Sequence, residues 1–422
     1  MSTLEKSLGP VSGTAMMLNT VLGVGILTLP GLAAAQSGAD SIWTWLLCAL
    51  ANVPLLAVFA LLASRFPEAG GVAHIAGCAF GRPAALVASF LFLGAVFLGL
   101  PSIALTGGNY LEAATGISAT KAAAALVIAA SLANLAIPRL AARIGSVAAG
   151  FVIVFLIALV ALSFVLVVGG DGSLAATGAA LSQPFSPALA FAPFMLVFFA
   201  FTGWEVALST TGEFQNPKRD VPLAVAISFV IAVGFYVVCA VTVVAAGPHA
   251  YTAAPFAAIL GPVLGPNAGL VIALGVVVLI AANLFAAFWA VSRMVLSVAR
   301  EGAMPKFLDT TRAGVPVAAI LVNCGIFLTV ILADWEGLVD IDGLIAKAGQ
   351  NFFIIYGMSA LALVRLGRTA MEKAFGLLSL AIVAGIAAYA GEHLFYPLVL
   401  IAAALLVHRW TPVPIAGPVA AK

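Results

Sequence analysis

The sequence predicts an all-α integral membrane protein with twelve transmembrane helices. Of its 422 residues, 64% are hydrophobic and only 8% are charged, and the mean hydropathy is +1.19. A soluble domain carries about 25% charged residues, so most of this chain must face lipid or the inside of a helix bundle. At about 20 apolar residues per crossing, we expect spans at 11–35, 42–63, 84–111, 119–137, 145–168, 189–212, 222–246, 267–298, 315–333, 343–365, 374–390 and 394–410.

The positions of the basic residues support an even number of crossings. Twelve spans with cytoplasmic ends place sixteen of the eighteen lysines and arginines in cytoplasmic segments and leave only Lys121 and Lys347 outside. Positive residues gather on the cytoplasmic side of membrane proteins, and an odd count would scatter this pattern. We therefore expect a multi-pass protein of the bacterial inner membrane, with both termini in the cytoplasm and a loose tail over 411–422.

Composition also argues against several classes of protein. The net charge is +2 and no basic stripe appears, which argues against nucleic-acid binding. The four cysteines are scattered, so we expect neither a metal site nor a disulfide framework. No HExxH, GxSxG or paired intramembrane carboxylates occur, and we expect no catalytic residue and no cofactor. The lipid bilayer is the expected surrounding, and a monomer and a homodimer both suit this architecture.

Two of the expected spans contain weak points at corresponding places. The first span has two glycines one residue apart, within the run Leu22, Gly23, Val24, Gly25 and Ile26. The sixth span is interrupted at Thr202-Gly203. Each glycine weakens a helix by about 1 kcal/mol. Glycines also allow close packing of membrane helices, but paired interruptions in the two halves of a chain indicate a transporter binding site near the midplane.

Unwound turns expose the backbone groups that a zwitterion needs. Freed N–H groups at the start of a half-helix suit a carboxylate, and freed carbonyls at the end of a half-helix suit an ammonium. An amino acid carries both groups. The two interruptions therefore favour an amino acid as the small-molecule substrate.

Glu205 follows the second interruption directly and is the sharpest candidate for a coupling or gating group. A carboxylate inside a bilayer span is costly unless it faces protein or water. Because burial in low dielectric disfavours the charged form, Glu205 is a candidate proton carrier. The alternative is a structural role, in which the carboxylate caps freed backbone N–H groups or bridges to another helix.

Four segments of the sequence resemble one family. They are GVGILTLP (23–30), RFPEAGGVAH (65–74) continuing to FG (80–81), FAFTGWE (199–205) with GEFQNPKRDVP (212–222), and SR (292–293) with AREGAMP (299–305). In this order and at these spacings they resemble the amino acid–polyamine–organocation (APC) transporters, which share the leucine-transporter fold. Within that family, the chain is most similar to bacterial exporters of methionine and branched-chain amino acids.

The resemblance implies a leucine-transporter-like fold of two inverted five-helix repeats. The repeats would span 11–168 and 189–365, with helices 1 and 6 broken, and two additional helices would occupy 374–410. The whole chain, 1–422, would form a single transmembrane transporter domain.

By the same resemblance, the backbone at the two breaks would hold the substrate. The substrate-binding positions would be Leu22, Gly23, Val24, Gly25, Ile26, Phe199, Ala200, Phe201, Thr202, Gly203 and Trp204. The aromatic members of this set would wall or gate the side-chain pocket. The small members favour an apolar substrate side chain over a cationic one.

Polar side chains in two later spans are further candidates for the lining of the site. They are Asn283, Gln350 and Asn351, for which interhelical hydrogen bonding is the alternative role. Residues 144–168 of the fifth span hold no ionisable side chain, so an amine in the place of a sodium ion is not supported. Exchange of amino acids, or proton antiport through Glu205, fits better.

These observations lead to a secondary active transporter of small neutral amino acids, of the methionine, leucine, isoleucine and valine class. It would work by alternating access, as an exporter by proton antiport or as an exchanger. Within transport, the alternatives are a proton-coupled amino acid importer and a cationic amino acid or polyamine exchanger. A channel is disfavoured because no repeated filter segment occurs, and a membrane-embedded enzyme is disfavoured because no catalytic motif does.

Overall fold

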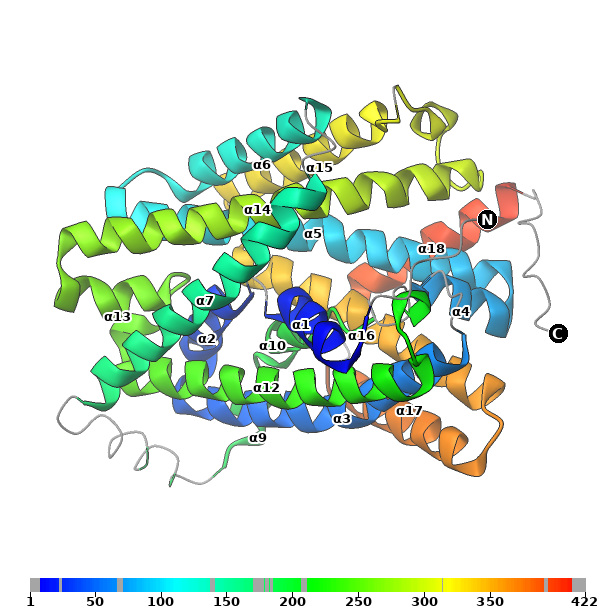
Figure 1. Cartoon of the computed structure of the whole chain (residues 1–422), viewed down its shortest axis with the longest axis horizontal. Coiled ribbons are helices and arrows are strands. Elements are labelled where there is room, and N and C mark those ends of the chain that lie inside the picture. Colours follow the sequence, from blue (N-terminus) through cyan, green and yellow to red (C-terminus); the bar gives the residue numbers. More distant parts are fainter. Residues whose placement is uncertain are drawn as a thin grey trace.

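The computed structural model describes residues 8–22, 25–66, 71–136, 141–169, 178, 182, 185–205, 211–312, 314–390 and 394–411. Over these ranges the chain is built from helices and turns, and its β pairing is confined to two isolated bridges, Leu8 with Phe214 and Arg312 with Val315. The longest helices run along the longest axis of the molecule (Figure 1). This is the arrangement that an apolar chain needs, since helices satisfy their own backbone groups in lipid.

The helices overlap the expected spans. The first half of the chain forms α1 (Pro10–Val21), α2 (Gly25–Ser37), α3 (Ser41–Arg65), α4 (Gly71–Phe80), α5 (Arg82–Thr115), α6 (Ala119–Ala136) and α7 (Ala141–Val168). The second half forms α9 (Pro187–Phe191), α10 (Phe194–Phe198), α12 (Pro217–Ala246), α13 (Pro255–Leu264), α14 (Pro266–Arg300), α15 (Val317–Trp335), α16 (Ile341–Leu366), α17 (Ala370–Ala390) and α18 (Phe395–Trp410). Short 3-10 turns are η1 (Gly38–Asp40), η2 (Phe199–Phe201), η3 (Thr211–Glu213), η4 (Pro248–Ala250) and η5 (Lys306–Asp309).

Within the described residues, seven helical stretches are long and apolar enough to cross a membrane by length and composition. They are Gly25–Arg65, Arg82–Thr115, Ala119–Ala136, Pro217–Ala246, Gly269–Arg300, Val317–Trp335 and Ala370–Ala388. Five shorter apolar helices accompany them, at Gly71–Phe80, Val154–Val168, Pro187–Phe201, Pro255–Leu264 and Phe395–Trp410. The chain is therefore a multi-helix apolar bundle, and the count of twelve crossings stays a prediction.

Two helices lie where loops were expected between spans. Helix α4 occupies part of the 64–83 connection and α13 occupies part of the 247–266 connection. Each carries an apolar run that ends at a glycine with positive φ, Gly81 (84°) after α4 and Gly265 (80°) after α13. A left-handed backbone position ends a helix at little cost only at glycine. These connections therefore fold as short helices that pack on the bundle.

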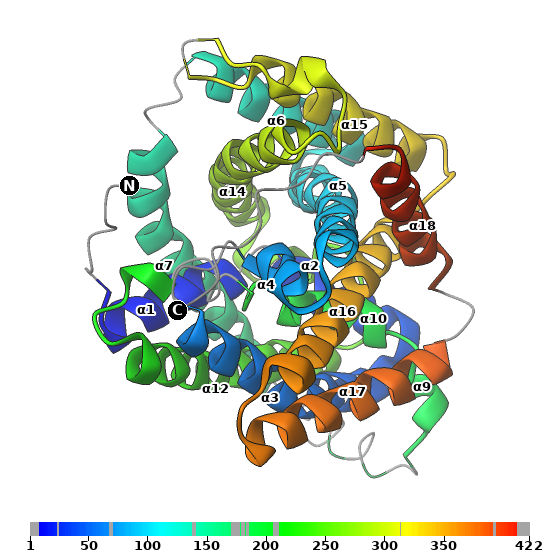
Figure 2. The same cartoon turned by 90° about the vertical axis from the view of Figure 1, so that its right-hand side faces the viewer.

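Two groups of helices meet in the bundle. In the end-on view of Figure 2, α5 lies inside a ring that includes α14, α16 and α18, all of which it contacts. In the second group α12 packs against α1, α2 and α3. Helix α10 joins the two groups, because it contacts both α3 and α16. The two interrupted segments lie at this junction, where η2 contacts α2, α3 and α16.

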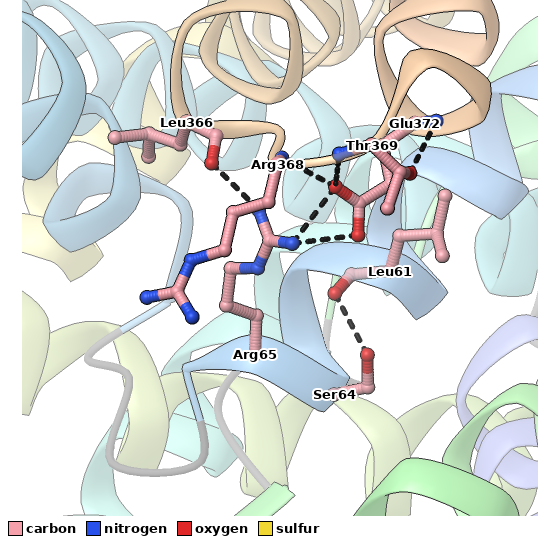
Figure 3. A network of polar contacts seen from close by, with 7 residues as sticks. All are labelled: Leu61, Ser64, Arg65, Leu366, Arg368, Thr369 and Glu372. Atoms are coloured by element: carbon pink, nitrogen blue, oxygen red, sulfur yellow. Dashed lines mark hydrogen bonds and ion pairs between the residues drawn. The ribbon is translucent and has the colours of Figure 1, made fainter.

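A polar clamp ties the end of α3 to the link between α16 and α17 (Figure 3). The Arg65 guanidinium donates to both carboxylate oxygens of Glu372, at 2.6 and 2.8 Å, and to the Leu366 carbonyl at 2.6 Å. Glu372 also accepts from the backbone N–H of Thr369, while the Thr369 hydroxyl accepts from the N–H of Glu372. This reciprocal pair is a capping box that starts α17.

Arg65 has an acidic partner that is distant in the sequence. Arg65 pairs with Glu372; Glu68, its acidic neighbour in the sequence, lies outside the described residues. Both side chains are partly buried, at 18% and 14% exposure. A charge-assisted, partly desolvated arginine–carboxylate pair is stronger than an ordinary surface ion pair.

We predict that Glu372→Ala lowers the free energy of unfolding by about 1–3 kcal/mol, because it removes a helix cap and leaves Arg65 without its partner. Thermal unfolding of the detergent-solubilised protein measures this change. Glu336→Ala, which removes an exposed acid at the end of α15, is the matched control and should have little effect. Equal effects of the two substitutions would contradict a stabilising clamp.

Candidate functional site

The first interruption lies between α1 and α2. Helix α1 ends at Val21 and α2 begins at Gly25, and Leu22 between them is buried. Gly23 and Val24 lie outside the described residues. Because a helix leaves its last four carbonyls without intrahelical partners, the end of α1 presents backbone acceptors in the middle of an apolar bundle.

The second interruption follows η2. Thr202 adopts an extended conformation with ψ 167°, and Gly203 has φ +106°, a value that favours glycine. A Cβ at Gly203 would lie 3.3 Å from side-chain carbons of both Thr20 and Val21. The two interruptions are therefore in direct contact, and Gly203 is what allows the backbones to approach.

Two buried tyrosines donate to the carbonyls around the interruptions. The Tyr236 hydroxyl of α12 lies 3.0 Å from the Val21 carbonyl oxygen and 2.7 Å from that of Ala200, so one hydroxyl bridges both interruptions. The Tyr356 hydroxyl of α16 lies 3.3 Å from the Phe201 carbonyl oxygen. The Thr202 hydroxyl donates to the Phe199 carbonyl at 2.8 Å. A buried carbonyl without a donor costs about 1–3 kcal/mol, so these contacts hold the unwound segments in place.

Glu205 is anchored by two donors. Its Oε2 atom accepts from the backbone N–H of Gly203 at 2.9 Å and from the Tyr356 hydroxyl at 2.9 Å. The carboxyl group therefore links the unwound segment after η2 to α16. This geometry is the one expected for a structural cap.

A cavity of about 180 Å³ lies at the junction of the two interruptions. Its lining comes from α1, α2, α5, α14, α16 and the segment after α10, and comprises Thr20, Val21, Gly25, Ile26, Ala95, Val96, Gly99, Leu100, Ile103, Phe199, Ala200, Thr202, Gly203, Glu205, Asn283 and Phe352. Eight of these were site candidates from the sequence. They are Gly25, Ile26, Phe199, Ala200, Thr202, Gly203, Glu205 and Asn283.

Other sequence candidates lie elsewhere. Phe201 and Trp204 are buried away from the lining and pack on aromatic rings, Phe201 on Tyr236 and Trp204 on Phe229. Gln350 lines a different cavity. Asn351 is fully buried beside Gly94 of α5.

The sequence analysis did not identify Tyr236, Tyr356 or the residues of α5 that line the cavity. Tyr236 and Tyr356 lie in expected spans seven and ten, far from either interruption in the chain, and their contacts arise only in the fold. Their hydroxyl groups within apolar spans were the one available signal, which for Tyr356 is weak because the same span also holds Gln350 and Asn351. Gly99 was also missed; a Cβ there would lie 3.2 Å from the Phe199 ring, so this glycine makes room for the aromatic wall.

The arrangement suits a small ligand with one polar end and one apolar end. The walls formed by Ile103, Phe199 and Phe352 are apolar, while the Thr202–Gly203 turn, the Asn283 amide and Glu205 supply polar groups. Small-molecule sites commonly combine an apolar lining with a few placed polar groups in this way. Among the described residues, no group of three or more His, Cys, Asp or Glu side chains is placed to hold a metal ion.

Comparison with known proteins assigns the chain to a family. The family model described as amino acid permease matches residues 8–418. The uncharacterized amino acid permease YecA of Bacillus subtilis is 29% identical over 95% of both chains. The L-methionine/branched-chain amino acid exporter YjeH of Escherichia coli is 28% identical over 86% of both chains, and the putrescine transporter PotE of the same species is 25% identical over 75% of this chain and 73% of its own.

A solved structure shares the fold. The crystal structure of MhsT in complex with L-phenylalanine superposes with a TM-score of 0.57, over 93% of this chain and 98% of that chain, at 16% sequence identity. MhsT has the leucine-transporter fold. At this identity the likeness shows the fold alone.

We predict that Tyr236→Phe lowers the free energy of unfolding by about 1–3 kcal/mol, because the Val21 and Ala200 carbonyls lose their shared donor. Tyr396→Phe is the control, since its hydroxyl donates to the Gly94 carbonyl inside the intact helix α5 and not to an interrupted segment. Thermal unfolding in detergent compares the two. The bridging role is wrong if Tyr236→Phe is no less stable than Tyr396→Phe.

Proposed function

This chain belongs to the amino acid permease family, and we propose that it carries small neutral amino acids across the membrane by alternating access. Its relatives are transporters and not enzymes. The observation that carries the proposal is the cavity at the contact of the two interruptions, because it combines apolar walls with a few polar groups, the Thr202–Gly203 turn, the Asn283 amide and the Glu205 carboxyl group, in a space of about 180 Å³.

The chemistry of the cavity supports a neutral substrate. Among the described residues that line it, Glu205 is the one acidic side chain and none is basic. Two donors already engage the Glu205 carboxyl group, so it is poorly placed to neutralise a second cationic group on the substrate. A substrate side chain would then contact Ile103, Phe199 and Phe352, which favours the methionine, leucine, isoleucine and valine class.

Alternating access would involve the contact between the interruptions. We propose that α1 with α2, and α9–η2 with the segment that follows, are broken helices 1 and 6 of two inverted repeats, 11–168 and 189–365. Short hinge segments absorb the backbone change when one helix group rocks against another. The twelve-span topology, with cytoplasmic termini in the bacterial inner membrane, completes the proposal.

Export is the proposed direction, by proton antiport or by exchange. The name of the Escherichia coli relative YjeH, an exporter of L-methionine and branched-chain amino acids, supports both the direction and the substrate class. The second candidate is a cationic amino acid or polyamine exchanger. It is favoured by similarity to the putrescine transporter PotE and by the Glu205 carboxyl group on the cavity wall.

Counterflow in proteoliposomes tests the proposal. Vesicles loaded with unlabelled methionine, leucine, arginine or putrescine receive the matching labelled compound outside, without sodium. We expect accumulation of methionine and leucine. Accumulation of only arginine or putrescine would replace the proposal with the second candidate, and no accumulation of any of them would remove the assigned substrate class.

We predict that Glu205→Gln retains leucine counterflow but loses uptake driven by a pH gradient, because glutamine keeps a carbonyl oxygen for the Gly203 and Tyr356 donors yet cannot carry a proton. The two assays are run on the same vesicle preparation. Gradient-driven uptake that survives in Glu205→Gln would assign Glu205 a purely structural role.

We predict that Gly99→Ala weakens binding of methionine and leucine by about tenfold and of alanine much less, because one added methyl group narrows the pocket beside Phe199. Gly234→Ala in α12 is the control, since a Cβ there meets no atom within 4 Å. Competition against labelled leucine measures both variants. An equal effect on all three amino acids would place the side-chain pocket elsewhere.

A further inference from the structure

The turn between α16 and α17 carries an excess of positive charge. Arg365 lies in the last turn of α16, Arg368 lies in the link, and Lys373 lies in the first turn of α17. The one acid among them, Glu372, is already bound by Arg65 and by two backbone N–H groups of the link. No ion pair joins Arg365, Arg368 or Lys373 to an acid in the described part of the chain. The turn therefore presents basic side chains whose charge no described residue balances.

Two of these side chains flank the link itself. Arg368 and Lys373 are both exposed. Arg368 takes part in the clamp only through its backbone N–H, and Figure 3 shows its side chain directed away from the Glu372 carboxylate. The Lys373 side chain lies against the link, because a Cβ on Gly367 would be 3.3 Å from the Lys373 Cγ atom. The clamp thus fixes the backbone from which both basic side chains project.

Next to these basic side chains, α17 exposes an apolar face. Met371, Leu377 and Leu378 are 64%, 57% and 52% exposed, and Met371 and Leu378 are seven residues apart and so on one side of the helix. Among the seven long apolar stretches that the structure describes, Ala370–Ala388 has the smallest buried share, 11%, and α17 lies at the edge of the bundle in Figure 2. In a membrane this face meets acyl chains, so the start of α17 lies at the level of the lipid headgroups.

We propose that the α16–α17 turn docks an anionic phospholipid, with the phosphate at Arg368 and Lys373 and the acyl chains along Met371 and Leu378 of α17. The unbalanced positive charge selects an anion, because basic side chains at a membrane surface attract anionic headgroups. The adjoining apolar face selects a lipid. Lys373 is two residues from Met371, so an amphiphile contacts both surfaces, whereas a soluble phosphate or an acidic peptide would use the basic side chains alone.

Lipid titration tests this site. Full-length protein, delipidated in dodecyl maltoside, is titrated with phosphatidylglycerol or with phosphatidylcholine of the same acyl chains, and native mass spectrometry gives the dissociation constant of the first bound lipid. We expect the wild type to bind phosphatidylglycerol more tightly. Arg368→Gln/Lys373→Gln should weaken phosphatidylglycerol binding by about thirtyfold and change phosphatidylcholine binding by no more than about twofold, because the two lost charges act on the net charge of the headgroup.

Arg300→Gln/Lys306→Gln is the matched control, because it removes the same charge from two other exposed residues. They lie at the end of α14 and in η5, and α14 lies apart from α17 in both Figure 1 and Figure 2. Distant charges are screened, so the control should bind phosphatidylglycerol within about twofold of the wild type. Both double variants should unfold at the wild-type temperature, since none of the four side chains has a hydrogen bond or ion pair with a described residue.

Three results would overturn the proposal. Equal affinity of the wild type for the two lipids would mean that the turn does not select an anionic headgroup. Equal weakening in the two double variants would assign the preference to the charge of the whole protein and not to this turn. Displacement of bound phosphatidylglycerol by an equal concentration of glycerol 3-phosphate would show that the apolar face of α17 contributes nothing, and the ligand would then be a soluble phosphate.

Discussion

The structure depends on how backbone carbonyls are satisfied where two helices stop inside an apolar bundle. In such surroundings each unpaired group costs several kcal/mol, and water is not there to replace the missing partner. Tyr236 and Tyr356 provide the donors from helices that run through the bundle. The interruptions are thus stabilised by side chains of other helices, and residues on both sides of them line the central cavity. Tyr236 has a further consequence, because its single hydroxyl makes the geometry of one interruption depend on the other.

The same constraint explains the character of the cavity. Since the Tyr236 hydroxyl lies between the Val21 and Ala200 carbonyls, and the Tyr356 hydroxyl lies beside Glu205 and the Phe201 carbonyl, few polar groups are left for a ligand. What remains is a small set of polar groups among apolar walls, which is complementary to a zwitterion with an apolar side chain. Glu205 fits this account both as a structural cap and as a proton carrier. Its carboxyl group is bonded to Gly203 and Tyr356, so a change in the backbone of the unwound segment would change its hydrogen bonds.

Local signals in the sequence were enough for the family, which the comparisons confirm, and for the helical, apolar nature of the chain. They also singled out Thr202-Gly203, where a positive φ needs glycine. Partners distant in the chain could not be predicted: Arg65 and Glu372 are 307 residues apart, and Tyr236 contacts α1 across 215 residues. The orientation of α16 about its own axis could not be predicted either, for a different reason. Helix α16 is apolar on most sides, so nothing in its sequence says that Gln350 faces a second cavity while Phe352 faces the central one.

The central claim is that the substrate binds where the two interruptions touch. The most direct measurement is an experimental structure of the protein with bound methionine. The account predicts ligand density between Gly25 and Gly203, with the methionine side chain directed at Phe199 and Phe352. Methionine bound elsewhere, with the space between Gly25 and Gly203 filled by side chains, would contradict it.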